Sequence, residues 1–178
     1  MARVGLSVAF ISVCSVIAIP IGSIPVTLSL FALMLTALLL SPFETLFAVL
    51  VYIALGAIGA PVFSGGGSGL GVLTGPTGGF LMAYPVMTSI ISVFRMIYEK
   101  RRPQSGVKYT LLLFAACAAT LPVCYFLGTL HFVNYAAVSV KYALSVCVIP
   151  FILPDLIKAA LAVWISDRVR PHIRSAAR

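Results

Sequence analysis

The sequence predicts an all-α integral membrane protein with six transmembrane helices and a glycine-rich outer loop between the third and the fourth. Of its 178 residues, 61% are hydrophobic and only 9% are charged. This leaves too little polar surface to cover a water-soluble domain of the same size. Apolar runs of spanning length recur along the chain, and basic residues gather in the short breaks between them. Both features are typical of a chain that folds in a lipid bilayer.

We place the spans within one membrane domain that covers residues 1–178, at about 4–20, 27–41, 43–60, 77–98, 108–128 and 151–169. Several are short for a hydrocarbon core of ~30 Å, which a helix of ~20 residues crosses. Pro20 and Pro25 mark the first break, and Pro42 marks the second. EKRRPQSGVK separates the fourth span from the fifth, and residues 129–150, expected to be an irregular outward-facing segment, separate the fifth from the sixth. The first run shows no clear signal-peptide cleavage site, so we interpret it as a retained span.

Basic residues predict the orientation of these spans in the cell (plasma) membrane. The positive-inside rule places both termini in the cytoplasm. Ten of the twelve basic residues then lie on the cytoplasmic side: Arg3, Arg95, Lys100, Arg101, Arg102, Lys108, Arg168, Arg170, Arg174 and Arg178. Lys141 falls in an outer loop and Lys158 in a span. Because the basic residues flank apolar runs, we expect them to meet lipid headgroups rather than nucleic acid.

The cysteines predict neither a metal site nor a disulfide framework. Cys14, Cys117, Cys124 and Cys147 all lie in apolar segments. They form no CxxC pair and have no accompanying histidine cluster. We therefore expect small buried hydrophobic side chains, with no metal and no cofactor.

Two charged residues stand out in FILPDLIKAALAVW, at the start of the sixth span. A charge at the centre of a span costs about 2.5–3.5 kcal/mol. Asp155 and Lys158 are three residues apart and share a helix face, and Asp155 follows Pro154 in the expected first turn, at the positive end of the helix. The pair is either a structural ion pair with a helix cap or the polar part of a binding cavity. In a cavity, Lys158 would meet a ligand carboxylate, and Asp155 would accept ligand N–H groups or orient the lysine.

The two glutamates of the chain, Glu44 and Glu99, fall at the cytoplasmic ends of the predicted helices. We expect solvated or helix-capping roles for both.

A glycine-rich tract, GAPVFSGGGSGLGVLTGPTGG, runs from Gly59 to Gly79 and contains nine glycines in twenty-one residues. Backbone groups in such a tract can approach a ligand closely because no Cβ intervenes. Aromatic side chains beside it offer stacking surfaces, and the helix start near Thr77 offers unpaired N–H donors. The candidate binding residues in and beside the tract are Phe63, Gly66, Gly75, Pro76, Thr77, Gly78, Gly79, Phe80 and Tyr84, with Thr27 from the outer loop IPIGSIPVT.

Two enzymatic interpretations of the tract fail. It lacks the lysine of a GxxxxGK[ST] phosphate loop, so the chain alone does not hydrolyse nucleotides. Gly66 to Gly69 match the GxSG of intramembrane serine proteases, with His131 or His172 as a base. However, Ser68 lies in a loop that would hold attack geometry poorly. His172 falls on the opposite membrane side, and His131 has no acid near it in the sequence. We expect a protein that is not an enzyme.

Three blocks, IPIGSIPVTLSL, GAIGAPVFSGGGSGLGVLTGPTGGF and IPFILPDLIKAALA, resemble the BioY family in order and spacing. These are the biotin-specific substrate-binding (S) components of energy-coupling factor (ECF) transporters. The resemblance covers residues 4–165 and implies the S-component fold with an outward-facing biotin pocket. It also implies a transmembrane coupling subunit and two cytoplasmic ATPases as partners. Asp155 and Lys158 match the family's biotin-contacting pair, and Gly75 to Gly79 match the loop and helix start that line its pocket.

The chain departs from the family pattern at several positions. Ser29 replaces a common glutamine, Pro154 replaces a glycine, and Ala83-Tyr84-Pro85 is unusual after GGF. The small-residue coupling motif of the first helix is blurred, with Gly5-xxx-Ala9 and Cys14-xxx-Ala18 as candidates. Apart from the resemblance, the residues indicate only a small, partly apolar carboxylate or amide as the ligand. An S component for another small carboxylate vitamin stays open as the alternative.

Overall fold

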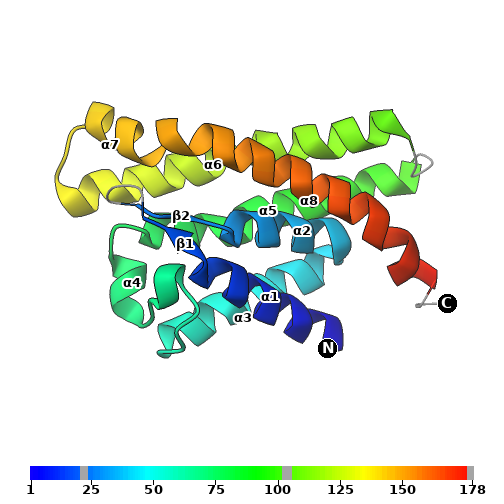
Figure 1. Ribbon diagram of the computed structural model, residues 1–178, viewed down its shortest axis with the longest axis horizontal. Helices are drawn as coiled ribbons and strands as arrows, with labels where there is room; N and C mark the ends of the chain where they lie inside the picture. The colour runs from blue at the N-terminus through cyan, green and yellow to red at the C-terminus, as the bar shows by residue number, and fades with distance from the viewer. Residues whose placement is uncertain (21–23, 102–105, 176–178) are drawn as a thin grey trace.

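The computed structural model describes residues 1–20, 24–101 and 106–175, and it is mostly helical, as predicted (Figure 1). Two short strands, β1 and β2, pair antiparallel, with Ala18 opposite Thr27. The elements in order are α1 (Ala2–Val16), β1 (Ala18–Ile19), β2 (Val26–Thr27), α2 (Ser29–Leu39), α3 (Pro42–Ala57), the 3₁₀ turn η1 (Ser64–Gly66), α4 (Leu70–Thr74), α5 (Gly78–Arg101), α6 (Val107–Ala136), α7 (Val140–Cys147) and α8 (Ile149–Ser175).

Three helical segments are long and apolar enough to cross a membrane: Gly78–Lys100, Val107–Ala136 and Val140–Arg170. The first three predicted spans also coincide with apolar helices, but these are shorter, at 15, 11 and 16 residues. At the α2–α3 junction, Ser41 and Pro42 fix the start of α3 and so separate it from the end of α2. The Ser41 side chain accepts the Glu44 N–H while the Glu44 carboxylate accepts the Ser41 N–H, and Pro42 opens α3. This capping box confirms the capping role expected for Glu44.

Helix α2 forms the centre of the bundle and packs against α8, α5 and α1 (Figure 1). Nine of its eleven residues are buried, including Ala32, Leu33, Met34, Ala37 and Leu38. Helices α5 and α6 pack against each other, and α3 packs against α5 and α1. A helix enclosed on all sides by protein needs no full spanning length, because its ends contact protein instead of lipid.

Two expectations about the C-terminal half are wrong. Residues 129–150 are not irregular, because α6 continues to Ala136 and α7 follows from Val140. Helix α8 begins at Ile149, so Asp155 is its seventh residue and does not cap the first turn. The reason is Pro150, which occupies the first turn, where a missing N–H costs nothing. The helix therefore starts at the earlier of the two prolines.

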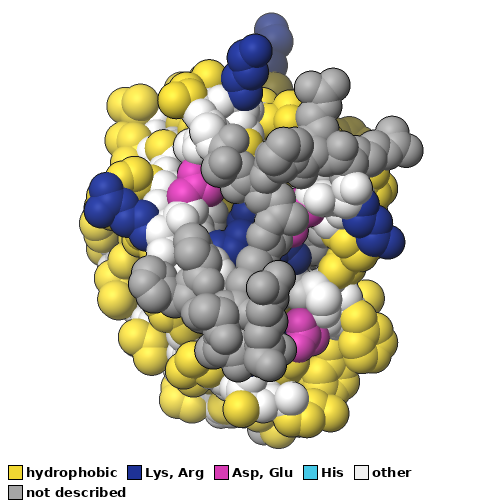
Figure 2. Space-filling model, turned by 90° about the vertical axis from the view of Figure 1, so that its right-hand side faces the viewer, with side chains coloured by type: hydrophobic (Ala, Val, Ile, Leu, Met, Phe, Trp, Pro, Cys, Tyr) yellow, Lys and Arg dark blue, Asp and Glu magenta, His cyan; other side chains and the backbone are white. Residues whose placement is uncertain are grey.

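Both chain termini lie at one end of the bundle, with α4, α7 and the β-pair at the other (Figure 1). Charged side chains show on the terminal end, surrounded by hydrophobic ones (Figure 2). Inside this end, Arg95 donates to the carbonyls of Leu38 and Leu40 at 2.8 and 2.6 Å, and Arg170 donates to Leu38 at 2.9 Å. Two cations thus satisfy the negative end of α2.

Glu99 differs from expectation, because it is neither solvated nor a cap. Its carboxylate pairs with Arg170 at 2.9 Å and accepts the Tyr109 hydroxyl at 2.6 Å. The Arg170 guanidinium also bonds the Tyr109 hydroxyl. This cluster ties α5, α6 and α8 together at the terminal end.

Candidate functional site

A cavity lies in the half of the bundle away from the termini. Its lining residues come from α1, β2 and the two residues before it, α2, α3, α5, α6, α8 and the glycine-rich tract. Seven of the predicted binding residues line it: Thr27, Phe63, Thr77, Phe80, Tyr84, Asp155 and Lys158. They come from four separate stretches of the chain that the fold brings together. The cavity encloses about 60 Å³, well below the ~300–1,000 Å³ typical of small-molecule pockets.

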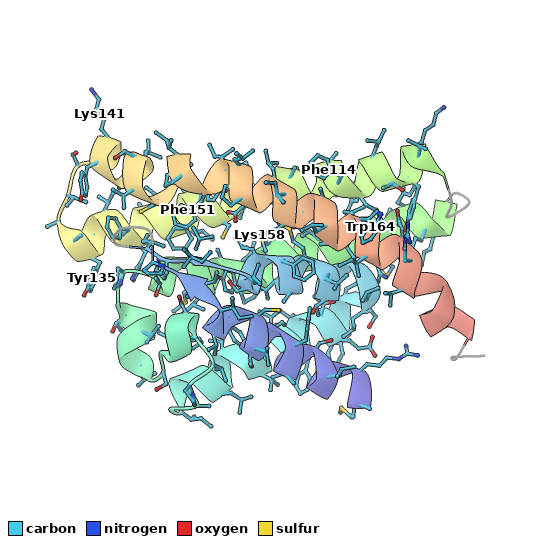
Figure 3. The ribbon with its side chains drawn as sticks, in the orientation of Figure 1. Phe114, Tyr135, Lys141, Phe151, Lys158 and Trp164 are labelled. Carbon is cyan, nitrogen blue, oxygen red and sulfur yellow. The ribbon has the colours of Figure 1, made fainter. Side chains whose placement is uncertain are left out.

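The polar floor of the cavity is a three-residue network built on α8. The Lys158 ammonium donates to Asp155 Oδ1 at 2.8 Å, and the Tyr125 hydroxyl from α6 donates to Asp155 Oδ2 at 2.8 Å. Asp155 is fully buried, and Lys158 is 6% exposed. Lys158 lies at mid-length of α8, inside the bundle (Figure 3). Each carboxylate oxygen already accepts a protein donor, whereas the ammonium has three donors and one hydrogen-bond partner among the described residues.

Hydroxyl groups form a second polar row in the lining. Thr27 Oγ1 lies 2.5 Å from Ser29 Oγ, which lies 3.2 Å from the Tyr84 hydroxyl. Ser29, the departure noted in the sequence, is therefore a polar lining residue. A row of hydroxyls can both donate and accept, which suits a ligand that carries N–H and C=O groups side by side.

Aromatic rings form the apolar part of the lining, and two of them rest directly on glycines. Phe63 is fully buried and packs edge-to-face on Tyr52, with ring centroids 5.6 Å apart. A Cβ added at Gly56 would lie 2.0 Å from the Phe63 ring, and one at Gly128 would lie 2.4 Å from the Phe80 ring. The missing side chains of Gly56 and Gly128 therefore leave the space that the Phe63 and Phe80 rings occupy beside the cavity.

We expect Gly56→Ala to push Phe63 into the cavity and to lower ligand affinity, with a stability cost of about 1–3 kcal/mol from overpacking. Gly71→Ala is the matched control, because an added Cβ there meets nothing within 4 Å. Thermal unfolding and ligand titration of both variants measure the two effects. Equal behaviour of the two variants would show that Gly56 does not position the ring.

Five other predicted residues do not line the cavity: Gly66, Gly75, Pro76, Gly78 and Gly79. The glycines among them allow close backbone packing or a left-handed backbone conformation within the tract. A Cβ at Gly78 would lie 1.8 Å from the Leu73 carbonyl oxygen, and one at Gly79 would lie 2.7 Å from that of Leu127. Gly66 has a φ of +82°, which favours glycine. The contact expected between their backbone and a ligand finds no support in this geometry.

Several residues that line the cavity are not predicted by the sequence, above all Tyr125, Tyr52 and Phe151. Each stands in or beside a long apolar run, where an aromatic residue gives no signal that separates a cavity wall from a lipid-facing surface. The one signal for Tyr125 is that a buried Asp155 carboxylate needs a second hydrogen-bond donor besides Lys158.

The protease arrangement is absent from the described residues. Ser68 is exposed in the loop after η1. His131 Nε2 lies 3.0 Å from the Gly75 carbonyl oxygen, and the side chain of His172 lies outside the described residues. No group of three or more potential metal ligands occurs in the described part of the chain.

The helical fold and the buried lysine–aspartate cavity define a membrane protein built to hold a small ligand that is partly apolar and partly polar. Comparison with known proteins gives the family. The BioY family model matches residues 1–175, and the chain belongs to the BioY family. The resemblance seen in the sequence is thereby confirmed.

Curated relatives and a solved structure agree with this assignment. The chain is 41% identical over 162 residues to biotin transporter BioY2 of Lactococcus lactis, covering 89% of this chain and 82% of the relative. It is 35% identical over 167 residues to a probable biotin transporter of Pyrococcus horikoshii, covering 94% and 93%. A crystal structure of the S-component for biotin from an ECF-type ABC transporter superposes with a TM-score of 0.87 at 26% identity, covering 96% and 89%. The family is one of transporters, so the chain is not an enzyme.

Proposed function

We propose that this protein is the S component that binds biotin and carries it across the cell membrane as part of an ECF-type complex. The observation that carries the proposal is the cavity floored by Lys158 and Asp155 in a chain of the BioY family. A buried charge pair is costly in a membrane helix, so its position in a cavity favours a binding role over a purely structural one.

The lining matches the parts of biotin. Biotin has a carboxylate, a ureido group with two N–H donors and one carbonyl, and an apolar thioether ring. Lys158 takes the carboxylate, and Asp155 orients Lys158 because its own oxygens are already engaged. The hydroxyl row of Thr27, Ser29 and Tyr84 faces the ureido group, and Phe63 and Phe80 pack on the rings. A largely apolar site with a few placed polar groups is what such a ligand requires.

Transport energy comes from partners, a transmembrane coupling subunit and two cytoplasmic ATPases. This chain carries no phosphate-binding loop. All six helices α1, α2, α3, α5, α6 and α8 cross the membrane in this proposal, with both termini in the cytoplasm. The proposal is supported by the termini lying at one end of the bundle and the charged side chains there (Figures 1 and 2).

The glycine-rich tract acts as the gate of the cavity. The cavity of about 60 Å³ must expand to admit a vitamin, and Phe63, Ser64, Val72 and Thr77 form its wall on the tract side. We expect bound biotin to slow backbone hydrogen exchange across residues 59–79, with residues 107–115 at the other end of the bundle as the unaffected control. Unchanged exchange in the tract would show that it is not a gate.

Uptake of labelled biotin by cells lacking their own biotin transporter tests the proposed function. We expect accumulation when the chain is co-produced with a coupling subunit and active ATPases, competed by unlabelled biotin and by no other carboxylate vitamin. The alternative, a different small carboxylate vitamin, predicts no accumulation of labelled biotin and accumulation of that vitamin when it carries the label.

A further inference from the structure

A second cavity lies on the outside of the bundle, between α6 and α7. It has a volume of about 560 Å³ and follows one face of each helix. The face of α6 contributes Pro122, Phe126 and Leu130. The face of α7 contributes Val140 and Leu144, and Val148 follows directly after that helix. Phe126, Leu130, Val140 and Leu144 are between 43% and 68% exposed, so the groove opens to the surroundings of the protein.

One polar group interrupts this apolar lining. Thr129 is 6% exposed, and its hydroxyl has no hydrogen-bond partner among the described residues. A buried hydroxyl without a partner carries a desolvation cost of about 1–3 kcal/mol. An occupant with a free acceptor oxygen at this depth would remove that cost.

The surroundings of the groove mark a membrane interface. Tyr135 and Tyr142 are 57% and 51% exposed, as in the aromatic belts of membrane proteins. Lys141 directly follows the groove residue Val140, and its side chain is exposed. Lys141 and Tyr135 lie at the same end of the molecule (Figure 3). From Val133 to Pro122 the groove runs about 16 Å along α6, at ~1.5 Å per residue.

We propose that this groove binds one anionic glycerophospholipid. One acyl chain lies along the α6 and α7 faces toward Pro122, an ester carbonyl accepts the Thr129 hydroxyl, and the phosphate meets Lys141. Tyr125 lines both this groove and the Lys158 cavity. The lipid therefore packs behind the residue whose hydroxyl holds Asp155.

Native mass spectrometry of the purified full chain, titrated with palmitoyl-oleoyl phosphatidylglycerol, tests the proposal. We expect one lipid per wild-type chain. Thr129→Val, which keeps the shape but removes the hydroxyl, should weaken binding at least threefold, and Leu144→Trp, which fills the groove, should weaken it at least tenfold. Leu153→Trp, on an exposed position of α8 outside the groove, is the control and should bind as the wild type does.

Further titrations distinguish the contribution of the lipid headgroup from that of the acyl chain. Lys141→Gln should weaken phosphatidylglycerol more than the zwitterionic phosphatidylcholine, and free palmitate should bind at least tenfold more weakly than the phospholipid. Equal lipid binding by the wild type, Thr129→Val and Leu144→Trp would overturn the proposal. So would wild-type dimers without lipid that Leu144→Trp dissociates, since a second copy would then cover the groove.

Discussion

Replacing Asp155 with alanine is expected to abolish biotin binding and to destabilise the protein by about 3–5 kcal/mol, the cost of leaving a buried charge without its partner. Lys158 is 6% exposed and Tyr125 points its hydroxyl at the same carboxylate. Without Asp155, the ammonium loses its countercharge and its orientation together. Thermal unfolding in detergent and equilibrium binding of biotin measure the two losses.

Asp167→Ala is the matched control, on the same helix but outside the cavity. Asp167 is half-buried and accepts the Thr110 hydroxyl at 2.6 Å. We expect this variant to bind biotin as the wild type does. Wild-type stability and affinity in Asp155→Ala would contradict the role of Asp155 in positioning Lys158.

Replacing Lys158 with methionine is expected to weaken biotin binding by about tenfold to 100-fold. A hydrogen bond to a charged group contributes about 1.5–3 kcal/mol, and each 1.4 kcal/mol is tenfold in affinity. Biotin amide lacks the carboxylate charge, so its affinity should fall much less. Titration of the same variant with both ligands measures the difference.

A variant with Asp155→Asn and Lys158→Met together separates binding from folding, because it leaves no buried charge uncompensated. It should fold as stably as the wild type. Relative to the wild type, its affinity for biotin should fall more than its affinity for biotin amide. Equal losses for biotin and its amide would assign Lys158 a structural role instead of a carboxylate contact.

The sequence predicted much of this architecture because the bilayer limits the choices. Apolar runs had to be helices, and Asp155 and Lys158 had to share a face because they are three residues apart. Phe63, Phe80 and Tyr84 line the cavity as their positions beside the tract suggested. These inferences depend on local spacing alone, which a single sequence displays.

Features that depend on tertiary contact could not be predicted. Tyr125 is one aromatic residue in a long apolar helix, and only the position of the Asp155 carboxylate reveals its role. The glycines Gly78 and Gly79 looked like ligand contacts, but they permit close packing against Leu73 and Leu127. The start of α8 was misplaced because two prolines, Pro150 and Pro154, both suit a first turn.

Calorimetric titration of the purified protein with biotin tests most directly the claim that the cavity between α2, α5, α6 and α8 is a biotin site. We expect saturable binding of one biotin per chain, lost in Asp155→Ala and retained in Asp167→Ala. No saturable binding by the wild-type protein, or equal binding by both variants, would contradict it.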